Sequence, residues 1–313
     1  MINLKVISNN IYVVKPYDRN SADCCVYMVN TKSDDGLFLI DVGLNIEPIH
    51  EIVKEGFKIK DIKHCLITHC HLDHIGACNE LKKLNNEIKF YAHELDAKKI
   101  EQVPMDEYIT QYYADYNYVP VKLYKKFKLD NEILKFGQLE IRVIHIPGHS
   151  PGSVAYYLDN GKNKILFGGD LPGIAINLHG GDLEAYLNSL TKLLDLKIDI
   201  LCEGHEDIIE PAKKVQKFIK GYMNLNKFLN KIVVEDPSNV EVLIDLILQT
   251  YDLGFYDVAL DFCNYLLEIV PNNIEGQNLL KKIKKHNPPK IDFIKSYIKE
   301  TFPEFINQLQ KKD

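Results

Sequence analysis

The chain of 313 residues is long enough for two domains, and its hydrophobic content of 46% can supply a sizeable core. The formal net charge of −6 gives no general attraction to nucleic acid, so nucleic acid is not an expected partner. No run approaches the ~18 apolar residues of a membrane span, and the first residues lack a signal-peptide pattern. We therefore expect a cytoplasmic protein that does not associate with membranes. The seven scattered cysteines do not form the pattern of a disulfide framework.

Strands and helices are expected to alternate along the first two thirds of the chain. Runs rich in β-branched and aromatic residues predict strands at 11–14, 25–29 and 37–40, and helical periodicity follows at 46–53 and 77–84. A second block repeats this order, with strands at 139–145, 154–158 and 165–167, a helix at 183–194 and a strand at 198–201. Two strand-rich blocks with intervening helices predict two sheets that pack face to face under outer helices.

The densest group of metal-binding side chains follows the apolar run 65–67. Three histidines and one aspartate, His69, His71, Asp73 and His74, occur within six residues on the turn that leaves this predicted strand. On such a turn His69 and His71 can converge on one metal ion, while Asp73 and His74 point at a second. Because burying so many imidazole and carboxylate groups is costly without a compensating cation, this segment predicts a metal site.

Further candidate ligands stand alone at the ends of apolar runs. His149 follows Val143-Ile144, Asp170 follows Ile165-Leu166-Phe167, and His205 follows Ile200-Leu201. Loops at strand ends are where a shallow metal cleft at a sheet edge would take its ligands. Asp41 closes the predicted strand 37–40, and its carboxylate could orient a ligand without touching the metal.

The order of these motifs resembles the metallo-β-lactamase superfamily over roughly residues 1–220. The resemblance implies an α+β fold, a four-layer αβ/βα sandwich, followed here by an all-α C-terminal extension over 221–313. It further implies metal 1 on His69, His71 and His149, metal 2 on Asp73, His74 and His205, and a bridge by Asp170. A hydroxide held between two divalent ions, most often zinc, would attack the substrate, with Asp73 as its orienter or proton acceptor.

This chemistry serves several substrates and leaves three functional interpretations open. The motifs are most similar to glyoxalase II-like hydrolases of small-molecule substrates, which implies cleavage of a thioester, ester or related bond. Iron can occupy the same ligands, so an iron-dependent redox or oxygen-binding member, such as a persulfide dioxygenase or di-iron sensor, is the first alternative. The segment 181–190 also resembles a subgroup with endoribonuclease activity, so a phosphodiesterase is a further alternative. The Gly-Cys-Gly-Arg segment of true glyoxalase II enzymes is absent after Asp170.

Two loops are expected to shape the substrate mouth. The segment 105–124 is rich in tyrosine and lies between the two sheet blocks, and 171–181 contains His179. The tyrosines are Tyr108, Tyr112, Tyr113, Tyr116, Tyr118 and Tyr124. Most of these side chains are interpreted as packing residues, with one or two at the mouth of the site.

The C-terminal part has a different pattern. The window 240–273 matches a tetratricopeptide repeat, with Gly254 in the turn between two helices, Ala259 at the small contact position and Pro271 at the closing turn. Further helices are predicted at 274–285 and 291–302. Because one repeat cannot bury its own apolar face, this extension either buttresses the catalytic domain or binds a protein partner or a second copy of the chain.

Overall fold

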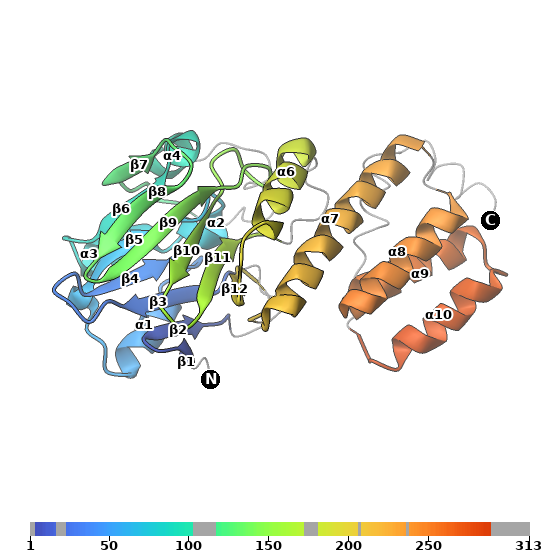
Figure 1. The fold of residues 1–313 in the computed structure, drawn as a ribbon, viewed down its shortest axis with the longest axis horizontal. Helices are drawn as coiled ribbons and strands as arrows, with labels where there is room; N and C mark the ends of the chain where they lie inside the picture. Colours follow the sequence, from blue (N-terminus) through green and yellow to red (C-terminus); the bar gives the residue numbers. More distant parts are fainter. Residues whose placement is uncertain are drawn as a thin grey trace. The chain divides into compact units, whose positions relative to one another are not determined.

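The computed structural model describes residues 4–16, 23–102, 117–171, 181–205, 208–235 and 238–288, without the side chains of 228–235 and 253. The chain divides into two compact units, residues 1–216 and 217–313. Figure 1 shows the strands in the first unit, and the elements described in the second unit are helices. None of the described helices is long and apolar enough to cross a membrane.

The first unit contains a seven-stranded sheet with the strands in chain order. The strands are β1 (Leu4–Ser8), β2 (Ile11–Val14), β3 (Val26–Asn30), β4 (Leu37–Ile40), β5 (Ile62–Leu66), β6 (Lys89–His93) and β7 (Lys125–Phe127). Neighbours from β1 to β4 are antiparallel, and those from β4 to β7 are parallel. The parallel half needs crossovers, which are α1 (Glu47–Lys54), a short 3-10 turn (Ile59–Asp61), α2 (Leu72–Ile75), α3 (Cys78–Leu84) and α4 (Glu94–Glu101).

A second sheet of five strands has the order β12-β11-β10-β9-β8. Its strands are β8 (Glu132–Phe136), β9 (Leu139–His145), β10 (Val154–Asp159), β11 (Lys164–Gly169) and β12 (Ile200–Glu203). Only the pairing of β11 with β12 is parallel among these strands. The connection between them contains α6 (Leu183–Leu194), whose N-terminus is capped by the Asp182 carboxylate.

The alternation of side chains along the strands produces two hydrophobic cores. Phe38 and Ile40 of β4 join the core that lies between the sheets, together with Phe167 of β11. Leu37 and Leu39 point to the opposite face and pack with residues of α1 and α3. Because both faces of β4 are covered, its four residues are all apolar, as its continuous hydrophobic run predicts.

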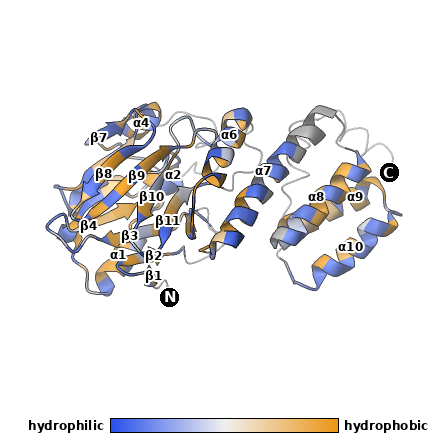
Figure 2. Ribbon diagram, viewed as in Figure 1, coloured by the Kyte–Doolittle hydropathy of each residue, from blue (hydrophilic) through white to orange (hydrophobic). Residues whose placement is uncertain are grey.

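Helix α6 covers the remaining face of the second sheet. A small pocket is lined by Gly168 of β11 and by Tyr186, Ser189 and Leu190 of α6, so these two elements face each other. Figure 2 shows hydrophobic colour on strands of both sheets and in bands along this helix. The predicted four-layer αβ/βα sandwich is therefore confirmed in this unit. All seven cysteines of the chain are buried free thiols.

The second unit contains most of α7 (Ala212–Glu235), together with α8 (Val240–Leu253), α9 (Tyr256–Ile269) and α10 (Ile274–Lys284). Gly254 ends α8 with a φ of +90°, a conformation that suits glycine, and Ala259 is fully buried in α9. Phe218 and Tyr222 of α7 pack on the ring of Phe255. The all-α extension is confirmed up to α10, whereas the helix predicted at 291–302 lies outside the described residues.

Candidate metal centre

The candidate ligands come from four strand ends. His69, His71, Asp73 and His74 lie on the segment that leaves β5 and enters α2. His149 lies on the loop after β9, Asp170 directly follows β11, and His205 follows β12. The seven side chains predicted as ligands are thus all described, and they form two adjacent clusters that share Asp170.

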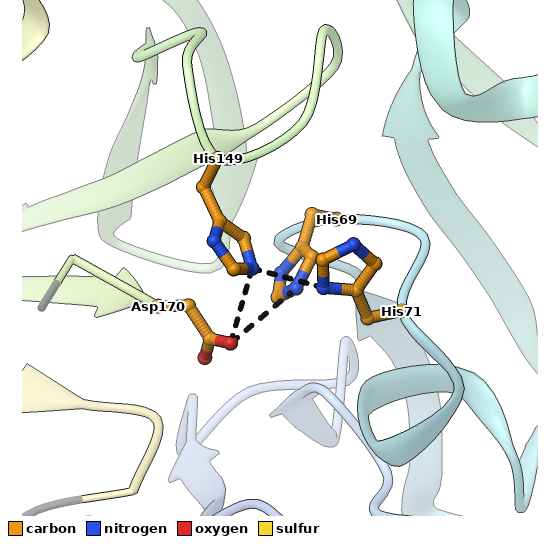
Figure 3. Close-up of side chains that lie close together, drawn as sticks. All are labelled: His69, His71, His149 and Asp170. Atoms are coloured by element: carbon orange, nitrogen blue, oxygen red, sulfur yellow. Dashed lines mark hydrogen bonds and ion pairs between the residues drawn. The ribbon is translucent and has the colours of Figure 1, made fainter. Parts of the chain in front are cut away.

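The first cluster, called site A, contains His69, His71, His149 and Asp170, one atom of each lying within 4.8 Å of the others. His149 Nε2 lies 2.9 Å from His71 Nδ1 and 3.2 Å from Asp170 Oδ2. His69 Nε2 lies 3.7 Å from the same Oδ2 atom. Figure 3 shows the three rings and the carboxylate turned toward a common centre, with His69 and His71 on one loop and His149 and Asp170 on two others. Three imidazoles and a carboxylate oxygen are suitable ligands for zinc.

The second cluster, called site B, contains Asp73, His74, Asp170 and His205. Asp170 Oδ1 lies 2.9 Å from His74 Nε2 and 3.2 Å from His205 Nε2. Asp73 Oδ2 lies 3.2 Å from each of these two ring nitrogens. The two oxygens of Asp170 therefore face different clusters, which is the arrangement that a bridging carboxylate requires.

Unsatisfied polar atoms in these clusters fit a pair of cations. His69 Nε2, His74 Nε2 and Asp170 Oδ1 are buried and make no hydrogen bond among the described residues, although the last two atoms face each other as an ion pair at 2.9 Å. Burying such atoms without a partner costs about 1–3 kcal/mol each, and more for charged groups. A divalent cation at each site would satisfy them, so the residues present fit a two-metal centre.

Charges in the two sites differ in a way that also fits metal binding. Burial lowers the pKa of His69 well below its usual range and that of His71 to about 3, so these two imidazoles are held in the neutral form that binds metal. Burial also opposes protonation of His74 and His205, but the surrounding negative groups outweigh it and hold both pKa values well above their usual range. The site B carboxylates thus require positive charge.

Asp41 contacts the candidate ligand His74 directly and His69 through Thr68, on the side of each ring that faces away from the cluster. These contacts fit the orienting role that the sequence suggests for Asp41. Its carboxylate lies 2.8 Å from His74 Nδ1 and accepts hydrogen bonds from the backbone and hydroxyl of Thr68, each 2.8 Å long. The Thr68 hydroxyl in turn lies 3.0 Å from His69 Nδ1. Both contacts leave Nε2 of the ring to face the metal position. The sequence pattern alone does not predict this role of Thr68. Its position directly before a candidate ligand histidine is the signal that indicates it.

A second buried carboxylate, that of Glu203, hydrogen-bonds to the loop of His205. The sequence analysis above does not include it among the functional residues. Glu203 is fully buried, and its side chain accepts a hydrogen bond of 2.7 Å from the backbone of His205. The backbone of Gly204 accepts another from Cys25 of the first sheet, 2.6 Å long. Burying a glutamate is unfavourable unless its carboxylate is hydrogen-bonded or paired. A glutamate at the end of an apolar strand, two residues before a candidate ligand, is therefore the sequence signal for this residue.

The tyrosine-rich loop is only partly described. Tyr118 is buried, and its hydroxyl donates to the carbonyl of Ile100 over 2.7 Å, which supports the packing interpretation for this residue. Tyr124 is exposed and lies edge-on to Tyr91. His179 lies outside the described residues. So do four of the tyrosines considered for the substrate mouth, which are Tyr108, Tyr112, Tyr113 and Tyr116.

Comparison with known proteins identifies the family. The family model of the metallo-beta-lactamase superfamily matches residues 23–205, which hold every ligand of sites A and B, and the chain belongs to this superfamily. An uncharacterized protein of Aquifex aeolicus is 31% identical over 190 residues, which cover 58% of this chain and 84% of that protein. The hydroxyacylglutathione hydrolase GloC of Haemophilus influenzae is 31% identical over 173 residues, with 53% and 78% covered.

Solved structures agree with this assignment. The subclass B3 metallo-beta-lactamase BJP-1 of Bradyrhizobium japonicum has a TM-score of 0.57 at 25% identity, covering 73% of this chain and 92% of that one. The class B3 di-zinc metallo-beta-lactamase LRA-12, from an Alaskan soil metagenome, shares the fold with a TM-score of 0.56 at 23% identity, with 74% and 92% covered. The chain is therefore a hydrolase of the metallo-beta-lactamase superfamily, with helices α7 to α10 following the matched region.

Proposed function

We propose that this chain is a dinuclear zinc hydrolase that cleaves a thioester or ester bond in a small-molecule substrate. The observation that carries the proposal is the position of Asp170, which offers Oδ2 to site A and Oδ1 to site B. Similarity to the hydroxyacylglutathione hydrolase GloC supports a thioester as the substrate class. The Gly-Cys-Gly-Arg segment is absent, so the thiol part of the substrate need not be glutathione.

The residues of the chain divide the work of such a reaction between them. His69, His71 and His149 would hold one zinc ion, and Asp73, His74 and His205 the other, with Asp170 shared. Two bound zinc ions would lower the pKa of water toward ~7 and polarise the oxygen of the scissile group. Asp73 would orient the attacking water and accept its proton, since its carboxylate is held between His74 and His205.

The test combines metal content with turnover. Protein purified without added metal should contain about two zinc ions per chain, and it should hydrolyse members of a panel of thioesters, esters, lactones and phosphodiesters. His71→Ala and Asp170→Ala should each lower kcat/KM by about 100-fold or more, because loss of a residue that only orients a ligand already costs about 10–100-fold. His50→Ala, which changes an exposed histidine of α1, is the matched control and should leave turnover unchanged.

Each outcome of this test points to a different conclusion. Full thioester and ester hydrolysis by either ligand variant would exclude the two-metal mechanism. Iron with a visible charge-transfer band that responds to oxygen would replace the hydrolase proposal by the redox interpretation. Turnover of phosphodiesters alone would keep the metal centre and change the substrate class.

A further inference from the structure

Asp96 is a buried carboxylate near the metal centre to which the hydrolytic reaction assigns no role. It lies in the first turn of α4, and only 1% of its surface is exposed. Its Oδ2 atom accepts a hydrogen bond of 3.0 Å from the backbone of Cys70 and one of 2.7 Å from the hydroxyl of Ser150. Its Oδ1 atom accepts one of 2.8 Å from the backbone of Gly152. Three donors thus converge on one carboxylate.

These donors belong to the two loops that carry all the histidines of site A. Cys70 lies between His69 and His71, on the segment that leaves β5 of the first sheet. Ser150 follows His149, on the loop after β9 of the second sheet. Asp96 therefore connects the two halves of the ligand set, although its carboxylate is not one of the metal-binding groups.

The packing around Asp96 leaves little room for another arrangement. A Cβ atom added at Gly152 would lie 2.5 Å from Asp96 Cγ and 2.7 Å from its backbone nitrogen, so only glycine permits this approach. The hydroxyl of Ser153 accepts a hydrogen bond of 3.0 Å from the backbone of Ser150 and lies 2.8 Å from its hydroxyl. Ser150 and Ser153 are both buried. A buried network in which every donor has an acceptor is rigid and specifies one geometry.

We propose that Asp96 is a positioning residue of site A, which fixes the distance between the His69–His71 segment and the His149 loop before metal binds. The two loops leave different sheets, and hydrogen bonds from Val154 and Tyr156 to the carbonyls of Thr68 and Ile67 join the strands beside them. Asp96 extends this connection into the loops themselves, so it restricts their relative movement before metal binds. Preorganisation of ligands raises metal affinity. Residues that hydrogen-bond to the ligands without touching the metal typically raise that affinity by about 10–100-fold. The inference rests on the proposed function only in that site A binds a metal ion.

Zinc affinity at each site, measured in the full chain, tests this role without recourse to turnover. A His205→Ala background keeps the ligands of site A and removes one from site B, while a His149→Ala background does the reverse. Asp96→Asn is introduced into both, because asparagine keeps the volume but presents an NH₂ group to at least one of the backbone donors. Zinc binding is then measured by competition with a chelator of known affinity.

In the His205→Ala background, Asp96→Asn should weaken zinc binding by about 10–100-fold. In the His149→Ala background, the same change should leave zinc affinity within about two-fold, since Asp96 contacts neither Asp73 nor His74. Asn85→Ala is the control for general loss of stability. It removes two side-chain hydrogen bonds to the carbonyls of Ile59 and Ile62, away from both ligand loops, and should not change zinc affinity in either background.

Ser150→Ala keeps the test decisive if Asp96→Asn fails to fold, since it removes one hydroxyl donor and should weaken site A alone, by a smaller factor. Unchanged affinity at site A in folded Asp96→Asn and Ser150→Ala proteins would overturn the inference, and so would an equal loss at both sites. If the wild-type chain binds two zinc ions while the variants do not differ from it, only the role of Asp96 fails. If the wild-type chain binds no zinc, the proposed function fails with it.

Discussion

At the scale of single residues, the centre places its strain and its buried charge where ligands are held. Asp41 adopts a φ of +57°, which is uncommon for a residue with a side chain, and its carboxylate nevertheless reaches both Thr68 and His74. Such a conformation costs of order 1 kcal/mol and persists only when surrounding contacts impose it. The three hydrogen bonds of Asp41 supply that constraint, so its backbone strain accompanies its orienting role.

Gly148, directly before His149, is expected to tolerate no side chain. Its φ is +139°, and an added Cβ would lie 2.3 Å from the Cα of Tyr186 in α6. Gly148→Ala should therefore lower the free energy of unfolding by about 3 kcal/mol, since it combines backbone strain with overpacking. Chemical denaturation with a fixed zinc concentration measures this change.

Gly161 is the matched control, because its φ is +80° and an added Cβ would meet no atom within 4 Å. Gly161→Ala should cost about 1 kcal/mol from strain alone. Equal losses in the two variants would show that contact with Tyr186 does not restrict the His149 loop.

The candidate ligands could be selected from the sequence because each carries a local signal. His69, His71, Asp73 and His74 crowd one short segment, and the isolated ligands follow apolar runs that mark strand ends. The structure brings all of them together, as the motif order leads one to expect. Asp96 has no such signal: its neighbours are ordinary helical residues, and its partners lie 26 and 54 residues away in the chain. Only the folded structure reveals that one carboxylate, that of Asp96, accepts hydrogen bonds from both the Cys70 segment and the Ser150 loop.

At the scale of secondary-structure elements, the sequence predicts interior strands better than edge strands. Strand β4 is fully buried and β11 is buried after Lys164, and the continuous apolar run in each of them predicts a strand. The sequence pattern predicts no strand at β1, β7 or β8, which are sheet edges with exposed polar residues, nor at the interior strand β6. Edge strands pair on one side only, so burial imposes a weaker pattern on their residues. The short α2 was also missed, because its residues were interpreted as part of the metal loop.

Strand β5 contains a buried histidine, His64, that should make stability depend on pH. Its Nδ1 atom lies 2.9 Å from the hydroxyl of Tyr91, and its ring packs against Phe136. Burial, aided by the charge of Lys89, lowers the pKa of His64 to about 4. The unfolded chain takes up a proton near pH ~6.5, whereas the folded chain resists it down to about 4. The stability that neutral His64 contributes is thus fully present above pH ~6.5 and is lost as the pH falls through this window.

His64→Gln removes this titration and keeps a group that can hydrogen-bond to Tyr91. Between pH ~6.5 and 4.5, the wild-type chain should lose about 1–2 kcal/mol more unfolding free energy than His64→Gln, roughly half of the full linkage energy because solvent screens part of the ring. Urea unfolding of both proteins at equal zinc loading measures the difference, in which any release of metal cancels. Parallel pH curves would contradict the assignment.

At the scale of the whole molecule, the candidate metal ligands belong to one of the two units. Sites A and B lie entirely within residues 1–216. Within the part of the second unit that the structure describes, no group of histidine, cysteine and carboxylate side chains can hold a metal ion. Its core is formed instead by apolar and aromatic residues, such as Phe262, Leu246 and Ala259. The two units should therefore respond differently to removal of metal.

A strong chelator should lower the thermal stability of the first unit and leave the second unchanged. Metal at 100 times its Kd stabilises the folded form by about 2.7 kcal/mol, which corresponds to about 5–10 °C in Tm for a unit of this size. Without the cations, only the protonated rings of His74 and His205 compensate for the buried charge of the site B carboxylates. Calorimetry of the full chain measures the shift, and hydrogen exchange read by mass spectrometry assigns it: amides in 1–216 should lose protection, while those in 217–313 should not. Added zinc should restore the original transition. Two results would contradict the case for a metal centre in the first unit. One is an unchanged Tm after verified removal of metal, and the other is a loss of protection confined to 217–313. Either result would show that the buried clusters are stable without a cation.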